Sequence, residues 1–422
     1  MAILMDINRK IEVAFDEVKK EALEFLKEMI RIPTENPPGN NYARFCTLAS
    51  TKLESLDYIV EIVEPPEERL ETLAPFGSGP RPNIIAATGT GKKRIGFNGH
   101  YDVVQAGNGW KHDPYDPVVL DGRLYGRGTT DMKSGIAAQI FAVELLKRAG
   151  LFPDPSLKVI HQLVPDEETV GIMNAGSGYL SEIGYMSKKH LDYLIFTEPL
   201  GSTNICYGHR GVLWGSIRLS GKKSHGAFPM MGGDAIKASC DVIEDYYSTV
   251  SRKAAISRSM HNIIPESSMS PSLLVGKING GTWANTVADE VDFTYVRRLI
   301  PEETLQEARE ELNTVLTETL KKNPSVTAKN IEYYAVDSVF SDRDSLLAKV
   351  FESSIKDVTG NAPQYVMSPG TFDMRFAVKE DIQTLNYGPG SVEQSHVNDE
   401  SISLLDFYTG IKVLAIALAK LA

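Results

Sequence analysis

The feature that most constrains the fold is an alternation of helical and strand-like segments over the first 200 residues. Apolar residues recur at helical spacing over about 7–30, 42–56 and 132–149. Short apolar runs lie between or after them, at 58–63, 84–88, 95–102, 157–164 and 191–197. This alternation predicts an α/β domain in which helices cover a mostly parallel sheet.

The pattern changes near Gly208. Alternating strand-like segments at 212–221, 273–281 and 291–297 are interleaved with predicted helices at 234–250 and 301–322, and a closing strand is expected near 331–336. This order is typical of a small α+β, ferredoxin-like domain built on one antiparallel sheet. The chain then returns to helix and short strands and ends with an apolar helix at 403–421. We therefore predict one domain from 1–208 and 335–422, with residues 209–334 inserted as a second domain.

Composition limits the class of protein. The chain has 42% hydrophobic and 23% charged residues, as expected of a soluble globular protein, and no apolar run suggests a membrane span. The N-terminus lacks the pattern of a signal peptide, and the three cysteines are far apart, which favours a reducing cytoplasm. The net charge of −11 disfavours non-specific nucleic-acid binding.

Histidine and acidic side chains follow several predicted strands. In N-G-H-Y-D-V-V, His100 and Asp102 stand two residues apart and so project from the same face of an extended segment. The other candidates are Asp131, Glu167, Glu168, Glu198 and His396. Each alone has an ordinary explanation as a helix cap, a solvated turn or a surface histidine. Together they place potential ligands at the carboxyl edge of one sheet, where open α/β sheets form their sites.

The kinds of ligand indicate a metal site. Two histidines, together with carboxylates at three further positions (Asp131, the pair Glu167-Glu168, and Glu198) and no thiolate, suit zinc, cobalt or manganese. Five ligands exceed the need of one catalytic zinc, and a carboxylate can bridge two ions, so we predict two divalent ions, most favourably zinc. The chain contains neither G-x-G-x-x-G, nor a P-loop, nor G-x-S-x-G, which argues against a nucleotide-binding oxidoreductase and a serine hydrolase.

Seven motifs, in order along nearly the whole chain, resemble those of the dinuclear zinc amidohydrolases. This family includes acetylornithine deacetylase, succinyl-diaminopimelate desuccinylase, aminoacylase and glutamate carboxypeptidase. The motifs are G-H-Y-D-V-V, W-x-x-D-P-Y, G-R-G-T-T-D-M-K-S-G, P-D-E-E, T-E-P, S-H-G-A-F-P and S-H-V-N-D-E. The sequence departs from the family at Tyr101, usually a small residue, and at Gln105, usually proline.

The resemblance implies two metal sites that share one ligand. One ion would be held by His100, Asp131 and Glu198. The other would be held by Asp131, Glu168 and His396, so that Asp131 bridges the two ions.

The resemblance also implies catalytic roles. Asp102 would orient His100, and Glu167 would be the general base. Because neighbouring residues of a regular strand point to opposite faces, Glu167 and Glu168 are expected on an irregular turn. His225 of S-H-G-A-F-P would stabilise the oxyanion, reaching the site from a partner subunit or after domain closure.

Substrate contacts follow from the same resemblance. Asn285 and Arg298 stand where family members hold the substrate's carboxylate or acyl group, with Arg297 as the alternative to Arg298. An arginine suits a carboxylate because its guanidinium donates two parallel hydrogen bonds. Gly370 and Thr371 resemble the loop that binds the α-carboxylate in the deacetylase-desuccinylase branch.

The resulting functional prediction is metal-dependent hydrolysis of the amide bond of an N-acyl amino acid, which releases a free amine and a carboxylate. The alternative is a metallocarboxypeptidase or dipeptidase of the same family. We expect a homodimer formed through the inserted domain, which would also act as a lid, and no nucleic-acid or membrane partner.

Overall fold

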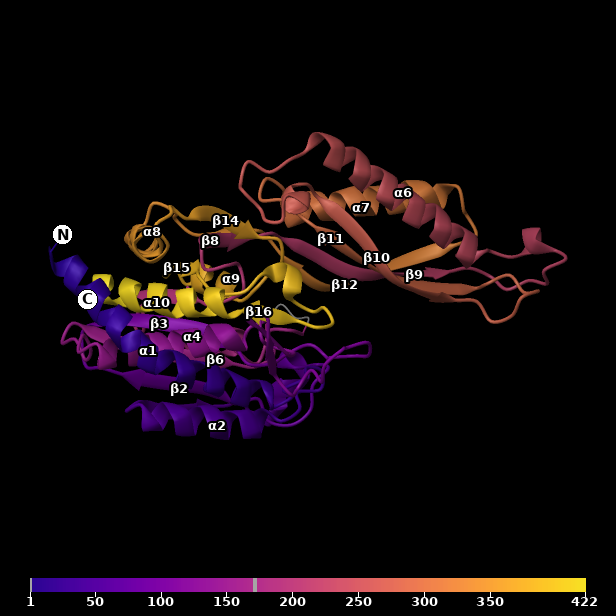
Figure 1. Ribbon diagram of the computed structural model, residues 1–422. Helices are drawn as coiled ribbons and strands as arrows, with labels where there is room; N and C mark the ends of the chain where they lie inside the picture. Colours follow the sequence, from indigo (N-terminus) through magenta and orange to yellow (C-terminus); the bar gives the residue numbers. More distant parts are fainter. Residues whose placement is uncertain (1, 170–172) are drawn as a thin grey trace. The chain divides into compact units, whose positions relative to one another are not determined.

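A computed structural model describes residues 2–169 and 173–422 of the chain. It divides into two compact units (Figure 1). The large unit comprises Met1–Gly208, Phe340–Val366 and Phe372–Ala422, and the insert comprises His209–Val339 and Met367–Thr371. The insert extends beyond the predicted boundary at 334, because its last strand, β12 (Thr327–Val336), stays paired with its neighbour up to Val336.

A nine-stranded sheet forms the centre of the large unit. Its strands are β1 (Ile59–Val63), β2 (Asn83–Thr88), β3 (Lys93–His100), β6 (Leu157–Val164), β7 (Tyr193–Phe196), β8 (Asn204–His209), β13 (Val339–Phe340), β14 (Gln364–Ser368) and β15 (Gln383–Asn386). The order is β1-β2-β6-β3-β7-β15-β8-β13, with β14 paired to β8. Neighbours β6, β3, β7 and β15 run parallel, so their carboxyl ends meet at one edge. The predicted α/β class with a mostly parallel sheet is confirmed.

Helices complete the large unit (Figure 1). They are α1 (Ala2–Ile30), α2 (Tyr42–Ser55), α3 (Glu67–Leu73), α4 (Lys133–Arg148), α5 (Ser177–Glu182), α8 (Leu346–Thr359), α9 (Met374–Lys379) and α10 (Leu404–Leu421). Helix α1 buries one stripe at helical spacing, and that stripe joins α4 and α10 in the main core. A separate antiparallel sheet contains β4 (Val118–Leu120), β5 (Arg123–Tyr125) and β16 (Ser401–Ser403). None of the described helices has the length and hydropathy needed to cross a bilayer.

Both faces of the central strand β3 are covered by helices. Asn98 Nδ2 donates to Ser177 Oγ of α5 at 3.0 Å, while the next residue, Gly99, faces Ile136 of α4. A side chain at position 99 would meet α4 atoms at about 3.0 Å, so glycine allows this close packing. The large unit therefore has helices on either side of the strands that lead to its carboxyl edge.

The insert has the strand and helix order expected from the sequence. It contains β9 (Val212–Ser220), α6 (Ala235–Ile256), β10 (Ser272–Gly280), β11 (Glu290–Arg298), α7 (Leu305–Lys321) and β12. The sheet order is β10-β11-β9-β12, and all three pairings are antiparallel. Helix α7 begins at Leu305 rather than at the predicted Pro301, because Thr304 and Glu307 form a capping box.

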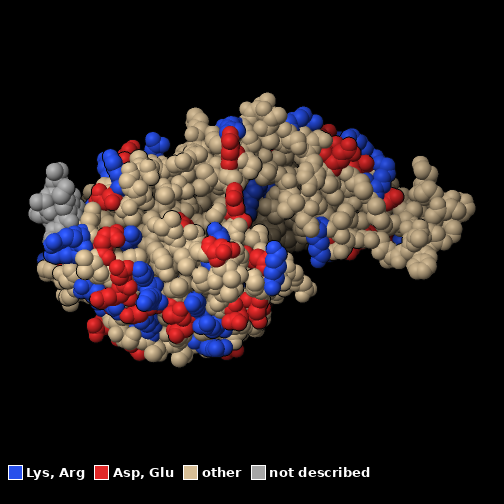
Figure 2. Space-filling view, in the orientation of Figure 1, with Lys and Arg blue, Asp and Glu red and all other residues tan. Residues whose placement is uncertain are grey.

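Charged side chains are spread over the large unit but are absent from two loops at one end of the insert. Acidic and basic side chains intermingle over the visible face of the large unit (Figure 2). The end of the insert that carries the loops 225–233 and 280–287 has no Lys, Arg, Asp or Glu in those loops. Phe228, Met230, Met231 and Trp283 are 62%, 94%, 72% and 75% exposed there. We call this surface the apolar tip of the insert.

Candidate metal centre

Three of the predicted ligands lie at or just after the carboxyl ends of parallel strands, whereas Asp131 and His396 lie on the loops before α4 and before β16. His100 is the last residue of β3, and Glu198 follows β7 by two residues. Glu167 and Glu168 follow the adjacent strand β6, whose Val164 is level with His100. Close packing of α4 supports this edge, since a Cβ at Gly135 would lie 2.1 Å from the carbonyl oxygen of Thr197.

One group of potential ligands contains His100, Asp131 and Glu198. His100 Nε2 lies 3.1 Å from Asp131 Oδ1 and 3.6 Å from Glu198 Oε1. Asp131 does not cap α4, because the N-cap position is Met132 and no side-chain cap bond is present. Its carboxylate is therefore available to this group.

A second group contains Asp131, Glu168 and His396. His396 Nε2 lies 2.8 Å from Glu168 Oε2 and 3.5 Å from Asp131 Oδ2. The two oxygens of Asp131 thus face the two histidines separately, Oδ1 toward His100 and Oδ2 toward His396. This is the arrangement that a carboxylate shared by two cations requires.

The donor set fits two divalent ions. Three carboxylates, Asp131, Glu168 and Glu198, converge, and within the described part of the chain neither Lys nor Arg forms an ion pair with any of them. Glu168 Oε1 is buried and has no hydrogen-bond partner among those residues. Carboxylates without a positive partner are costly when their side chains are only 5–12% exposed, and bound dications would compensate their charge.

The pKa values of the site residues are shifted by burial and by neighbouring charged groups. Burial raises the pKa of Glu167 well above its usual range, and burial raises the pKa of Glu198 to about 7 against the lowering effect of His100. The hydrogen bond with Glu168 raises the pKa of His396 to about 9. Cations bound here would instead favour ionised carboxylates and neutral imidazoles. Glu167 belongs to neither ligand group, so it remains a candidate proton acceptor.

Asp102 connects the two predicted strand ends. Its carboxylate is fully buried, and Oδ1 lies 3.4 Å from His100 Nδ1. The backbone N–H groups of Glu167 and Glu168 donate to Asp102 at 3.3 and 3.1 Å. The preceding Asp166 has a left-handed φ of 64°, which ends the regular strand geometry. The expected irregular turn is confirmed.

The sequence reasoning missed Glu400, which supports Asp131. Glu400 is fully buried and accepts hydrogen bonds from the backbone N–H groups of Gly128, Thr130 and Asp131 at 3.1, 2.7 and 3.0 Å. Arg127 also donates to it at 2.7 Å. Glu400 is the last residue of the motif S-H-V-N-D-E, but the motif alone does not show that this residue packs against the loop at 128–131.

Asn36 and Asp166 were missed as well. Both are buried beside Asp102, and Asn36 Nδ2 donates to the carboxylates of Asp102 and Asp166 at 2.9 and 3.0 Å. Asp166 stands within P-D-E-E, whereas Asn36 lies in the turn T-E-N-P-P-G, which carried no chemical signal by itself.

The predicted residues of the insert form two groups. His225 and Asn285 lie on neighbouring loops, because Gly226 N–H donates to Asn285 O at 2.7 Å. Arg298 Nη1 donates to Thr371 Oγ1 at 3.4 Å, and Gly370 lies on the same loop as Thr371. The nine-residue strand β11 separates the two groups, a span of about 26 Å at 3.3 Å per residue.

The contacts of Arg297 and Arg298 distinguish them. Arg297 is fully buried and forms ion pairs with Glu303 at 2.5 Å and Glu311 at 3.1 Å. Arg298 has no Asp or Glu at ion-pair distance among the described residues, and burial lowers its pKa. Arg297 is therefore committed to the interior of the insert, and Arg298 remains free to pair with a carboxylate of another molecule.

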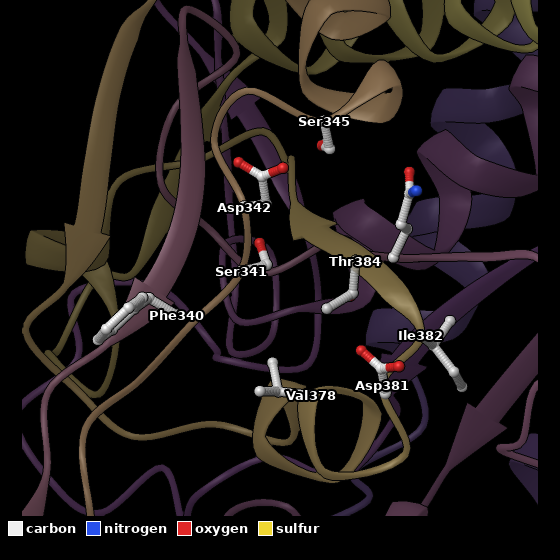
Figure 3. Close-up of a pocket in the computed structure, with 9 residues that line it drawn as sticks. Phe340, Ser341, Asp342, Ser345, Val378, Asp381, Ile382 and Thr384 are labelled. Carbon is white, nitrogen blue, oxygen red and sulfur yellow. The ribbon is translucent and has the colours of Figure 1, made fainter.

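A separate cavity of about 190 Å³ lies elsewhere in the large unit (Figure 3). Ser341, Asp342 and Ser345 line it from the segment before α8, and Asp381 and Thr384 line it from the start of β15. The other end of β15 carries Asn386, whose Oδ1 accepts from Glu198 N–H at 2.7 Å. None of the predicted site residues lines this cavity.

Comparison with known proteins identifies the family. A model of peptidase family M20/M25/M40 matches residues 96–420. The succinyl-diaminopimelate desuccinylase of Psychrobacter sp. (strain PRwf-1) is 30% identical over 331 residues, which cover 77% of this chain and 78% of that enzyme.

Two solved structures have the same fold. The di-peptidase Dug1p of Saccharomyces cerevisiae matches with a TM-score of 0.78 at 18% identity, over 99% of this chain and 98% of that one. The M20 family metallo-carboxypeptidase Sso-CP2 of Sulfolobus solfataricus matches with a TM-score of 0.73 at 19% identity, over 94% and 98% of the two chains. The resemblance carried by the seven motifs is confirmed. The chain is a hydrolytic enzyme and belongs to peptidase family M20/M25/M40.

Proposed function

We propose that this enzyme hydrolyses the amide bond of an N-acyl amino acid, as an acetylornithine deacetylase or succinyl-diaminopimelate desuccinylase does. The observation that carries the proposal is the pair of ligand groups that share Asp131, next to the proton acceptor Glu167. The 30% identity to a desuccinylase supports an acylated amino acid as the substrate class.

Divalent metal ions are the cofactors that the donor set suits. His100 and Glu198 would hold one ion and Glu168 and His396 the other, with Asp131 between them. Zinc fits this set of imidazole and carboxylate ligands, and cobalt or manganese could replace it. Such ions supply Lewis acidity, which polarises an amide carbonyl and lowers the pKa of water.

The side chains divide the remaining chemistry. The carboxylate of Glu167 takes a proton from the attacking water and returns it to the nitrogen of the leaving amine. Desolvation raises the pKa of Glu167, which makes this carboxylate a stronger base than an exposed glutamate. The backbone carbonyl oxygen of Asp102 lies 3.0 Å from His100 Nδ1 and its Oδ1 lies 3.4 Å from the same nitrogen, so Asp102 orients the ring. Its carboxylate also accepts the backbone N–H groups of Glu167 and Glu168.

Arg298 is our candidate for binding the substrate's carboxylate. It lacks an acidic partner among the described residues, unlike Arg297, and it lies beside the hydroxyl of Thr371. The guanidinium would pair with the carboxylate in a bidentate manner. The hydroxyl of Thr371 donates to the carbonyl oxygen of Arg210 at 3.0 Å and the N–H of Gly370 to Ser368 Oγ at 3.2 Å, so this loop would shape the pocket beside Arg298. Asn285 would contact the acyl side of the substrate.

We propose a homodimer in which the insert serves both as the dimerisation domain and as the lid. His225 and Asn285 lie at one end of β11 and Arg298 at the other, about 26 Å apart, so one insert cannot bring both groups to one small substrate. In a symmetric dimer His225 would act in the partner's site. The exposed apolar tip, with Phe228 and Met230, is a surface suited to burial between subunits.

We further propose that the enzyme works in the cytoplasm. Its three cysteines are free thiols, and Cys240 is exposed. Exposed free thiols persist in reducing compartments.

The test is amine release by the metal-free protein after titration with zinc, cobalt or manganese. The panel contains N-acetylornithine, N-succinyl-diaminopimelate, other N-acetyl amino acids, dipeptides and peptides with a C-terminal glutamate. We expect metal-dependent cleavage of an acylated amino acid. Cleavage of peptides alone would support the metallocarboxypeptidase or dipeptidase alternative, which the folds of Dug1p and Sso-CP2 also allow. No cleavage with two ions bound would contradict both.

A further inference from the structure

A buried polar cluster lies behind the turn that carries Glu167 and Glu168. It consists of Asn36, Asp166, Tyr42 and Arg81, and none of these belongs to either ligand group. Asn36 and Asp166 are 2% and 0% exposed. We call these four residues the Asn36 cluster.

The amide of Asn36 joins two carboxylates. Its Nδ2 donates to Asp102 Oδ2 at 2.9 Å and to Asp166 Oδ1 at 3.0 Å. The other oxygen of Asp102 faces His100 Nδ1, and Asp102 also accepts the N–H groups of Glu167 and Glu168. Asn36 therefore contacts the same carboxylate that holds the turn.

Asp166 is anchored from three directions. Besides Asn36, the hydroxyl of Tyr42 donates to its Oδ1 at 2.8 Å, and Arg81 Nε lies 2.7 Å from its Oδ2. Arg81 is itself held by the carbonyl oxygens of Pro38 and Ser78 at 2.6 and 2.7 Å. The residue that starts the turn, with φ 64°, cannot shift without breaking these contacts.

Without the amide, Asp102 and Asp166 would face each other in a site that excludes water. Each carboxylate would lose a buried hydrogen bond, and Arg81 would offset the charge of Asp166 but would leave the repulsion with Asp102 unbridged. The turn would then move or loosen, and both Glu167 and Glu168 move with it.

We propose that Asn36 and Asp166 are positioning residues, which hold the turn so that Glu168 faces His396 while Glu167 remains free to accept a proton. The kinetic part of this inference rests on the proposed function. The structural part of the inference does not rest on that function, because it concerns only how rigidly residues 165–169 are held and how tightly the protein binds metal.

The experiment compares wild type, Asn36→Ala and Tyr42→Phe with Asn83→Ala as the matched control. Asn83 is also a fully buried amide, but its Nδ2 donates to the carbonyl oxygens of Val63 and Ala175 and to no residue of the turn or of the Asn36 cluster. Three quantities are measured: hydrogen exchange of a peptide ending at 169 in the metal-free protein, metal affinity by calorimetry, and kcat with KM.

We expect Asn36→Ala to speed exchange at the turn, to weaken binding of one of the two ions, and to lower kcat about 10–100-fold at nearly constant KM. Tyr42→Phe removes one donor to Asp166 and should produce smaller changes in the same direction. This milder variant provides the test if Asn36→Ala does not fold. The control should lose thermal stability with exchange at the turn and kcat unchanged.

Exchange and metal affinity that match the control in both variants would overturn the inference. A wild type without amide hydrolysis would refute the proposed function alone, since exchange and calorimetry still decide whether the cluster positions the turn. Variants that lower thermal stability while leaving all three quantities unchanged would assign the cluster a purely structural role.

Discussion

At the scale of single residues, Glu167 and Glu168 show how adjacent, identical side chains acquire different environments. The left-handed backbone of Asp166 ends the strand, and Asp102 then accepts both following N–H groups. As a result Glu168 contacts His396 at 2.8 Å, while Glu167 lies outside both ligand groups. Backbone geometry, rather than residue type, separates the two roles.

Replacing Glu167 by glutamine should abolish proton transfer and leave the ligands intact. We expect kcat to fall about 10²–10⁴-fold, the usual contribution of a general base, with two ions still bound. Turnover and metal content by atomic emission are the measurements. Loss of one ion with this variant would instead assign Glu167 as a ligand and Glu168 as the base.

Replacing Arg297 or Arg298 should have different effects, one on stability and the other on substrate binding. Arg298→Ala should raise KM for substrates with a free carboxylate about 10–100-fold, because a bidentate charged pair is lost, and should leave stability nearly unchanged. Arg297→Ala should instead destabilise the insert by about 1–3 kcal/mol, because Glu303 and Glu311 lose a buried partner but keep Lys253 at 2.6 and 3.0 Å. Steady-state kinetics and thermal unfolding measure the two effects, and the opposite pattern would exchange the assignments.

At the scale of elements, the parallel strands β6, β3 and β7 place three of the predicted ligands, His100, Glu168 and Glu198, at one edge. The packing of these strands with α4 depends on buried polar contacts. His161 of β6 lies between Gln139 Oε1 of α4 and the hydroxyl of Tyr58, both at 3.0 Å. Burial lowers the pKa of His161 to about 3 from an ordinary value of 6.5. The folded protein therefore keeps this histidine neutral.

This histidine predicts a pH dependence of stability. The folded pKa lies below the unfolded one, so the unfolded chain binds the proton first, and stability falls as pH drops from about 6.5 toward 3. Between pH 6.5 and 5.0 the wild type should lose roughly 1.5 kcal/mol more than His161→Gln. Denaturant unfolding of both metal-free proteins tests this, and parallel pH profiles would contradict it.

At the scale of the whole molecule, the insert carries two groups of predicted site residues, toward opposite ends of β11. If His225 serves the partner's site, then inactive subunits should complement one another. Mixing His225→Ala with Glu167→Gln should form hybrid dimers with one complete site, which restores about one quarter of wild-type activity in a symmetric dimer. Activity is measured before and after dissociation and reassociation, with each variant alone as the control.

Activity that stays at the level of the separate variants, with hybrid dimers confirmed by mass spectrometry, would contradict a shared site. His225 would then act within its own chain or not at all.

Much of the fold was predictable from the sequence because it depends on local periodicity. The helix and strand patterns located most of the long elements of both units, and the alternation indicated the parallel sheet. The short elements α3, α5 and β8 and the small sheet of β4, β5 and β16 were not predicted. The strand ends at His100 and Glu198 were also predictable, because polar ligands directly after apolar strands are a local signal.

The tertiary structure alone decided which side chains meet. Asn36 and Asp166 are 130 positions apart, and Glu400 is 269 positions from Asp131, so no periodicity links them. The choice between Arg297 and Arg298 also needed the fold, because adjacent residues of a strand point to opposite faces and only one of them meets Glu303. The sequence by itself determined the elements and the kinds of ligand, because these depend on neighbouring residues. The contacts that orient those ligands join distant segments, and only chain packing brings them together.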